Sequence, residues 1–210
     1  MYRSRRGYRS PRREAQAAQT RSDIRGAARA LIRRHGLGGT TMEAIAREAG
    51  VAVQTVYAAY RSKAAILSAI LDEFEAEADP ATLAANLVRS TSPLEELRAV
   101  VAYNRRLFDR AGDFIAFAEG SLATDADVAA HVAEGHRRRR AAQRRIVEGW
   151  AASGALRQGL TRTTATDILW SLTSPGVHRL MVDGCGWSSV RYERWVVQVL
   201  AEQLLGDARP

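Results

Sequence analysis

The fold is decided by Thr41–Lys63, TMEAIAREAGVAVQTVYAAYRSK. Within it, Ala46 is followed four residues later by Gly50, and Val56 comes six residues after the glycine. Two short helices that cross closely need a small residue at the crossing, a turn residue free to adopt unusual φ values, and a branched apolar residue as an anchor. The spacing therefore predicts a helix-turn-helix.

Helical patterns flank this segment on both sides. Upstream, apolar residues recur at helical spacing between Ile24 and Ile32, which predicts a packing helix over residues 20–35. Downstream, a long helix is expected to open at Lys63. We therefore expect a three-helix domain over residues 20–66, preceded by a disordered basic arm over residues 1–19.

The charge of the chain is divided unevenly. Residues 1–66 hold 14 Lys and Arg against 4 Asp and Glu, whereas residues 67–210 hold 17 against 19. A basic segment joined to a nearly neutral body indicates one polyanion-binding module and one module with another task. The alternative reading of the charge alone is a solvated basic tail on a globular protein.

Composition limits the compartment. No apolar run approaches the roughly 18 residues of a membrane-spanning helix, and no apolar stretch follows the basic N-terminus as in a secretory signal. A single cysteine, Cys185, excludes an internal disulfide. We expect a cytoplasmic protein without a membrane partner.

Residues 67–210 form the second expected domain, and they too have helical patterning. Capping residues and Gly or Pro breaks divide them. After the end of the helix that opens at Lys63, the expected helices span residues 92–110, 113–120, 124–152, 163–181 (kinked at Pro175) and 188–205. The predicted fold class is all-α.

The N-terminal pattern resembles the TetR family of bacterial transcriptional regulators. The resemblance covers residues 20–71 and is only architectural beyond them. Four features of the family are present. They are a threonine before the second helix (Thr41), a Gly-Val turn (Gly50, Val51), a Thr-hydrophobic-Tyr run (Thr55, Val56, Tyr57) and a Ser-Lys pair (Ser62, Lys63).

The resemblance implies a DNA-contacting surface. Hydroxyl and ammonium groups at helix N-termini suit phosphate oxygens, and Gln or Thr at the start of a recognition helix can reach base edges. The alternative for Thr55 and Tyr57 is ordinary capping and packing. The expected DNA-binding residues are Thr41, Gln54, Thr55, Tyr57, Tyr60 and Lys63.

Three alanines depart from the family pattern. Ala58 and Ala59 stand where an aromatic residue and a histidine are common, and Ala52 replaces a capping serine. The recognition helix then offers fewer side chains for base reading. Part of the affinity is therefore expected from arginines near the N-terminus, namely Arg9, Arg12, Arg13 or Arg21.

The resemblance also implies a homodimer through the last two helices, which would place two recognition helices ~34 Å apart on one face of the DNA. Packing within a single chain is the alternative for the apolar residues involved. These residues are Ile168, Leu169, Leu172, Trp195, Val196, Val199, Leu200 and Leu204.

Polar residues interrupt two apolar stripes of the second domain. Arg139 and Gln143 fall on the stripe of residues 124–152, and Asn104 falls on that of residues 92–110. We predict an effector cavity in which Arg139 favours a carboxylate or phenolate. In the alternative, Arg139 snorkels and Gln143 makes a structural hydrogen bond. The predicted ligand-binding residues are Asn104, Phe108, Phe114, Phe117, Arg139, Gln143, Trp150 and Trp170.

Enzyme chemistry has little support in the sequence. His131 and His136 are five residues apart and do not share a helix face as paired metal ligands should, and Cys185 has no evident base partner. We predict no catalytic residues, no cofactor and no metal.

The expected function is a ligand-responsive transcriptional regulator. It would be a repressor that binds a palindromic operator as a dimer and is released by a small-molecule effector. The alternative is a DNA-binding regulator without an effector, controlled through protein contacts of its helical C-terminal domain.

Overall fold

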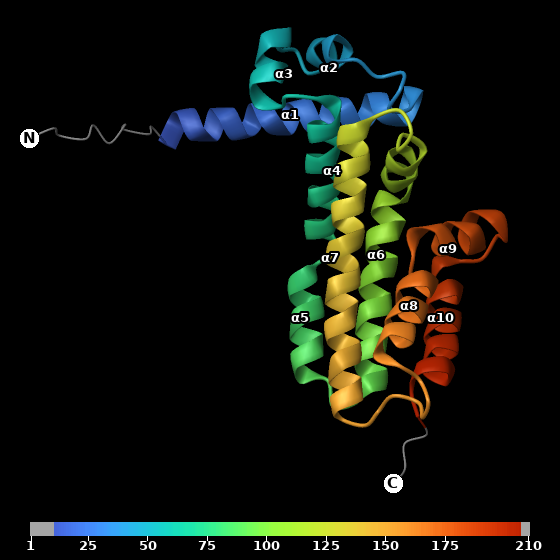
Figure 1. Ribbon diagram of the computed structural model, residues 1–210. Coiled ribbons are helices and arrows are strands. Elements are labelled where there is room, and N and C mark those ends of the chain that lie inside the picture. Colours follow the sequence, from blue (N-terminus) through green and yellow to red (C-terminus); the bar gives the residue numbers. More distant parts are fainter. Residues whose placement is uncertain (1–10, 207–210) are drawn as a thin grey trace, which may run out of the picture. The chain divides into compact units, whose positions relative to one another are not determined.

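The computed structural model describes residues 11–206, and every element within that range is helical (Figure 1). The prediction of an all-α fold is therefore confirmed. The chain divides into two compact units, Met1–Ile70 and Leu71–Pro210. The division falls inside α4 (Lys63–Glu77), slightly later than the boundary expected after residue 66.

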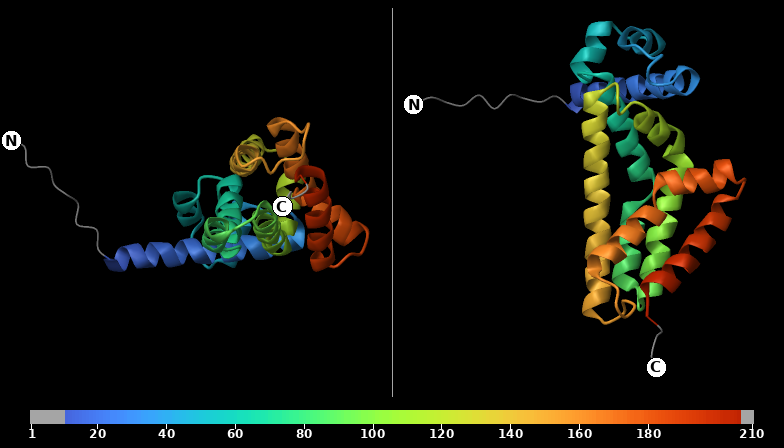
Figure 2. Two further views of the ribbon diagram at one scale, coloured as in Figure 1. Left: turned by 90° about the horizontal axis from the view of Figure 1, so that it is seen from below. Right: turned by 45° about the vertical axis from the view of Figure 1, so that its right-hand side comes forward.

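The first unit contains α1 (Pro11–His35), α2 (Met42–Glu48), α3 (Val53–Ala59) and the start of α4. Within this unit, α2 packs on both α1 and α3 (Figure 2). The helix α1 has one apolar face because its buried residues recur at steps of three and four. They are Ile24, Ala27, Ala28, Leu31 and Ile32.

The prediction of a disordered arm over residues 1–19 is wrong for residues 11–19. They form the first turns of α1, which begins at Pro11. The prediction rested on missing apolar periodicity, but exposed helical turns need only good intrinsic propensity. The run of Ala, Gln and Glu from Glu14 to Gln19 supplies it. Residues 1–10, including Arg9, lie outside the described residues.

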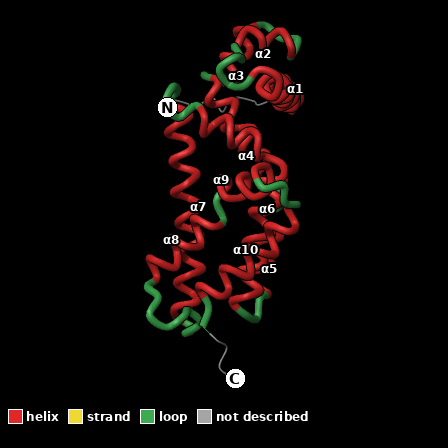
Figure 3. Tube along the Cα trace, turned by 90° about the vertical axis from the view of Figure 1, so that its right-hand side faces the viewer, coloured by secondary structure: helices red, strands yellow, loops and turns green. Residues whose placement is uncertain are grey.

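The second unit is built on two long helices. Here α6 and α7 run lengthwise, α5 lies beside α6, α8 lies beside α7, and α10 packs on both α6 and α8 (Figures 1 and 3). Its elements are α5 (Pro80–Arg89), α6 (Pro93–Gly120), α7 (Ala126–Ala152), α8 (Arg162–Leu172), α9 (Pro175–Arg179), a π-helix (Leu180–Gly184) and α10 (Ser189–Leu204).

One helix, α6, replaces the two that were expected over residues 92–110 and 113–120. Gly112 lowers helix propensity by about 1 kcal/mol relative to Ala. However, Phe108, Ala111 and Phe114 are all buried at helical spacing across this point, so tertiary packing outweighs the glycine. The helix α5, in which no residue is buried, was not predicted from the sequence.

The region around Pro175 is a break rather than a kink. α8 ends at Leu172, and Ser174 caps the new helix α9 by accepting a hydrogen bond from the backbone N–H of Val177 at 3.3 Å. Proline suits this first turn because it needs no N–H partner there. The following π-helix occupies part of the segment expected to be a loop.

The core of the second unit uses apolar residues that were assigned to a dimer interface. Leu169, Val196, Leu200 and Leu204 are fully buried within the single chain, among residues of α6, α7 and α8. For these four residues the alternative of monomer core packing is correct. The reason is that the inner face of α10 packs on both α6 and α8.

Candidate functional site

The turn between α2 and α3 has the geometry that a helix-turn-helix requires. Gly50 adopts φ +66°, a conformation that side-chain-bearing residues rarely adopt. The backbone N–H of Val51 donates to the carbonyl of Ala46 at 3.0 Å, which closes the turn. Val56 is fully buried and anchors α3.

Four of the predicted DNA-binding residues lie on α3 or at the start of α2. Thr41 is exposed and caps α2, because its Oγ1 accepts from the backbone N–H of Ala44 at 3.1 Å. On α3, Gln54 is exposed and Thr55 is half-buried. Tyr57 is 48% exposed, so its side chain is accessible to a partner.

The other two predicted DNA-binding residues already hold contacts within the first unit. The hydroxyl oxygen of Tyr60 accepts from Nη1 of Arg25 at 2.8 Å, and the Tyr60 ring is buried. Nζ of Lys63 donates to the backbone carbonyl of Leu37 at 3.0 Å. Both side chains therefore fix the frame that presents α3.

Exposed arginines lie elsewhere on the first unit. Arg12, Arg13 and Arg21 lie on the surface of α1, and Arg61 follows α3. Together with the net positive charge of residues 1–66, they make the first unit a surface suited to a polyanion.

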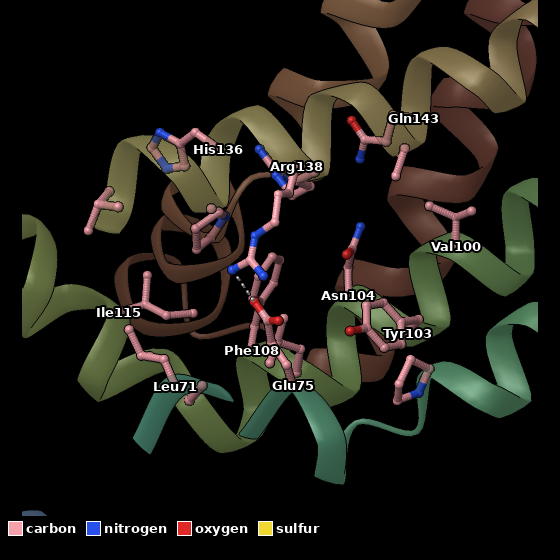
Figure 4. A pocket seen from close by; sticks show the side chains of 18 of the residues that line it. Leu71, Glu75, Val100, Tyr103, Asn104, Phe108, Ile115, His136, Arg138 and Gln143 are labelled. Carbon is pink, nitrogen blue, oxygen red and sulfur yellow. Dashed lines mark ion pairs between the residues drawn. The ribbon is translucent and has the colours of Figure 1, made fainter. Parts of the chain in front are cut away.

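A cavity of about 420 Å³ lies in the second unit (Figure 4). Its walls come from the end of α4, from α5, α6 and α7, and from Pro175. Four of the eight predicted ligand-binding residues line it: Asn104, Phe108, Arg139 and Gln143.

The four aromatic residues that complete the predicted set do not line the cavity. Phe114 packs on Phe74 with ring centroids 5.3 Å apart, and Phe117 meets Phe114 edge to face at 6.1 Å. Trp150 belongs to the core and donates from Nε1 to Glu96 at 2.6 Å. Sequence spacing placed these rings on the right helices but could not tell inner packing from cavity lining.

Trp170, the last of the four, lies beneath the guanidinium of Arg139, which is 5.1 Å from its ring centroid. Arg139 also donates from Nη1 to the backbone carbonyl of Thr173 at 2.7 Å and from Nη2 to that of Trp170 at 3.1 Å. Burial lowers the pKa of Arg139 to about 10. These bonds satisfy carbonyls at the C-terminal end of α8, so Arg139 has a structural role, but it is held by the backbone and does not snorkel as the alternative expected.

Gln143 makes a structural hydrogen bond, as the alternative interpretation expected. Its Nε2 donates to Oγ1 of Thr173 at 2.9 Å.

Several residues that line the cavity were not predicted from the sequence. Glu75 and Arg138 form an ion pair at 4.0 Å across the lining (Figure 4). Tyr103 also lines the cavity, and burial, assisted by the charge of Glu75, raises its pKa. The sequence offered no signal for the Glu75 contact, because it joins residues of α4 and α7 that are far apart in the chain.

Comparison with known proteins agrees with this geometry. Residues 24–70 match the family model described as bacterial regulatory proteins, tetR family. They include the whole helix-turn-helix and the start of α4. The helix-turn-helix region of the chain is that of the TetR family. This confirms the resemblance proposed from the sequence.

Solved structures extend the similarity of fold to the second unit. A transcriptional regulator, FadR from Bacillus subtilis, in complex with stearoyl-CoA, is 18% identical, with a TM-score of 0.70 over 85% of this chain and 96% of that one. A TetR-family regulator from Agrobacterium tumefaciens is 19% identical, with a TM-score of 0.65 over 90% of this chain and 100% of that one. The SmeT–triclosan complex is 18% identical, with a TM-score of 0.71 over 90% and 93%.

These similarities establish a TetR-like fold for this chain. A search of curated proteins gives no match. Across residues 11–206, no helix is long and apolar enough to cross a bilayer. In the same range, no three His, Cys, Asp or Glu side chains are grouped to hold a metal ion. His131 and His136 both line the cavity instead.

Proposed function

We propose that this TetR-family regulator is a repressor that binds a palindromic operator as a homodimer in the cytoplasm and is released when a small molecule occupies the cavity of its second unit. The observation that carries the proposal is the cavity itself. It combines apolar walls with a few buried polar side chains, the usual composition of a small-molecule site. The complexes of FadR with stearoyl-CoA and of SmeT with triclosan support an effector site by analogy of fold.

The proposed DNA contacts come from the exposed side chains of the helix-turn-helix. Thr41 and Tyr57 would meet phosphates, and Gln54 and Thr55 would meet base edges. Tyr60 acts by holding the frame. Lys63 combines both tasks, since an ammonium has three N–H donors and Leu37 takes only one.

We propose that the chain dimerises through α8 and α10. The proposed interface uses fewer residues than the eight expected from the sequence. Ile168, Leu172, Trp195 and Val199 are only half-buried in the single chain and can lose further apolar area on pairing. Two copies related by a twofold axis would present two recognition helices to successive major grooves.

The helix α4 is the element through which the effector would act. It begins at Lys63 in the first unit, and its later residues Leu71 and Glu75 line the cavity. A ligand that binds more tightly to one arrangement of α4 shifts the population toward that arrangement and changes the spacing of the recognition helices. No catalytic role is proposed.

The experiment is to sequence genomic DNA fragments retained by the purified full-length chain and to measure its mass by sedimentation. The proposal expects a dimer and an enriched motif with twofold symmetry. A chain that stays monomeric at high concentration and prefers no fragment over scrambled competitor would refute it. A dimer that binds its motif but responds to no compound in a broad thermal-shift panel would instead support the regulator controlled by protein contacts.

A further inference from the structure

Three buried polar atoms on cavity-lining residues have no hydrogen-bond partner in the described chain. They are Nδ2 of Asn104, Oε1 of Gln143 and Nε of Arg139. The two amide residues are almost completely buried, with Asn104 5% and Gln143 3% exposed. Buried polar groups in native proteins are nearly always paired, so an unpaired set around one cavity points to a bound molecule that completes it.

The orientation of Gln143 follows from its neighbour Thr173. The Thr173 hydroxyl has one hydrogen, which it donates to the carbonyl of Leu169 at 2.6 Å. Its oxygen can therefore only accept from Gln143, and this fixes Nε2 of Gln143 as the atom at 2.9 Å. The remaining oxygen of Gln143 is then an acceptor in need of a donor.

The other two unpaired atoms are donors. Asn104 projects from α6 and Gln143 from α7, and the two side chains point toward each other across the cavity (Figure 4). The Nε–H of Arg139, one turn before Gln143, can only donate. A ligand group that satisfies this wall must both accept and donate hydrogen bonds.

An anionic group does not complete this wall. Glu75 pairs with Arg138, and Glu119 pairs with Arg179 at 3.3 Å. The Arg139 guanidinium donates to two neutral backbone carbonyls, which leave its positive charge in place. A carboxylate could accept from its Nε–H, but it has no donor for the Gln143 oxygen, which would stay unpaired.

The rest of the lining is mainly apolar. The side chains that provide it belong to α6 and α7 and include Val100, Leu107, Phe108, Ile115, Val132 and Ile146. A ligand of this cavity therefore needs a mostly apolar body besides its polar group.

We propose that the effector is an uncharged, mostly apolar molecule with a carboxamide. Its carbonyl accepts from Asn104 and Arg139, and its N–H donates to Gln143. This inference rests on the proposed sensor function. The carboxamide replaces the carboxylate or phenolate expected from the sequence. The carboxamide is selected because it carries an acceptor and a donor within one planar group, matching the complementary atoms of the wall.

Three probes of similar shape test the inference: 4-butylbenzamide, 4-butylacetophenone and 4-butylbenzoate. The first accepts and donates, the second only accepts, and the third is an anion. Binding to the full-length protein is measured by calorimetry and thermal shift. We expect the amide to bind about tenfold more tightly than the ketone or the carboxylate, since each of these leaves Gln143 unpaired. Equal binding of amide and ketone, or tightest binding of the carboxylate, overturns the inference.

Two isosteric variants locate the preference. Gln143→Met should remove the advantage of the amide over the ketone, and Asn104→Leu should weaken amide and ketone together. If either variant fails to fold, the carbonyl stretching band of 13C-labelled amide answers the question in the wild-type protein. A shift to lower frequency on binding supports the hydrogen bonds, and an unchanged band contradicts them.

Release of DNA separates this inference from the proposed function. The operator fragment retained by the protein is titrated with each probe and followed by fluorescence anisotropy. Amide-selective binding without any change in operator affinity would refute the sensor function and leave the ligand preference standing. Operator release by the ketone or carboxylate alone would retain the sensor and refute the amide class. Absence of binding by all three probes also overturns the inference.

Discussion

Lys63 donates a hydrogen bond from Nζ to the backbone carbonyl of Leu37 at 3.0 Å, which joins the first residue of α4 to the chain that follows α1. The same ammonium is proposed to contact a DNA phosphate. Lys63→Met should therefore lower the free energy of unfolding by about 1 kcal/mol and reduce the slope of log affinity against log salt by ~1. Denaturant unfolding and salt-dependent anisotropy measure the two effects. Arg61→Met, which removes the same charge from an exposed position, is the control for stability. An unchanged salt slope in Lys63→Met would exclude the phosphate contact.

Tyr57 and Tyr60 should separate DNA binding from folding. Tyr57 is exposed, whereas the hydroxyl of buried Tyr60 accepts from Arg25. Tyr57→Phe should weaken operator binding about tenfold and leave the melting temperature unchanged, because the substitution removes only a hydrogen bond to a phosphate. Tyr60→Phe should lower the melting temperature, because Arg25 no longer has this acceptor. Each variant is the matched control for the other, and the reverse pattern would contradict the assignment.

The N-terminal arginines should add to the salt dependence. Arg12 and Arg13 lie on exposed turns of α1. Removing residues 1–19, or replacing both arginines by Gln, should weaken operator binding and reduce the salt slope by ~0.9 for each phosphate that the protein no longer neutralises. Gln16→Ala changes the same helix without changing charge and serves as the control. A slope identical to that of the full chain would show that this segment does not contact DNA.

Arg139 should matter for stability before it matters for ligand binding. Arg139→Gln leaves the carbonyls of Trp170 and Thr173 without their donor, and we expect the free energy of unfolding to fall by about 2 kcal/mol. Urea unfolding gives the value. Arg140→Gln removes an exposed pair with Asp167 and a guanidinium contact with the Trp170 ring at 5.8 Å, and should cost less than about 1 kcal/mol. Equal losses in the two variants would argue against the role of Arg139 at the end of α8.

His178 should make stability depend on pH. It lies between the rings of Phe108 and Tyr192, at centroid distances of 5.5 and 5.0 Å, with Asp109 3.5 Å from its Nε2. Burial lowers its pKa below 6.5, although the charges of Asp109 and Asp183 act in the opposite direction. The unfolded chain then binds a proton more readily than the folded one, so the stability contributed by His178 is lost as pH falls below about 6.5.

The check is urea unfolding of the wild type and of His178→Gln at roughly pH 7.5 and pH 5.5, above and below the ordinary His pKa. The wild type should lose more stability on acidification than the variant. Parallel losses would mean that other groups carry the pH dependence.

The helix-turn-helix could be predicted because its signals are local. A threonine that caps α2, a glycine at positive φ and a valine at the anchor position are each set by residues within a few positions of one another. At Gly112 a local signal failed, because packing keeps α6 continuous. At Pro175 a local signal was misjudged, because the cap at Ser174 begins a new helix, α9, after the end of α8.

The cavity could be predicted only in part. Helical spacing identified Asn104, Phe108, Arg139 and Gln143 as lining candidates, and all four line it. The same spacing could not distinguish a ring buried against another ring, as in Phe114, from one that faces a cavity. Nor could it supply Glu75, which reaches the lining from α4.

The sequence by itself determined that this chain is helical, that its first unit is a TetR-family helix-turn-helix, and that α6 and α7 carry polar residues on apolar faces. These properties follow from short-range spacing, capping and charge. Only the tertiary structure decided which of those polar groups are already paired. Arg139 donates hydrogen bonds to carbonyls at the end of α8, and Lys63 donates one to the carbonyl of Leu37. In contrast, Nδ2 of Asn104 and Oε1 of Gln143 have no hydrogen-bond partner among residues 11–206. The physical reason is that a hydrogen bond between distant residues depends on how helices pack, and no local pattern encodes that geometry.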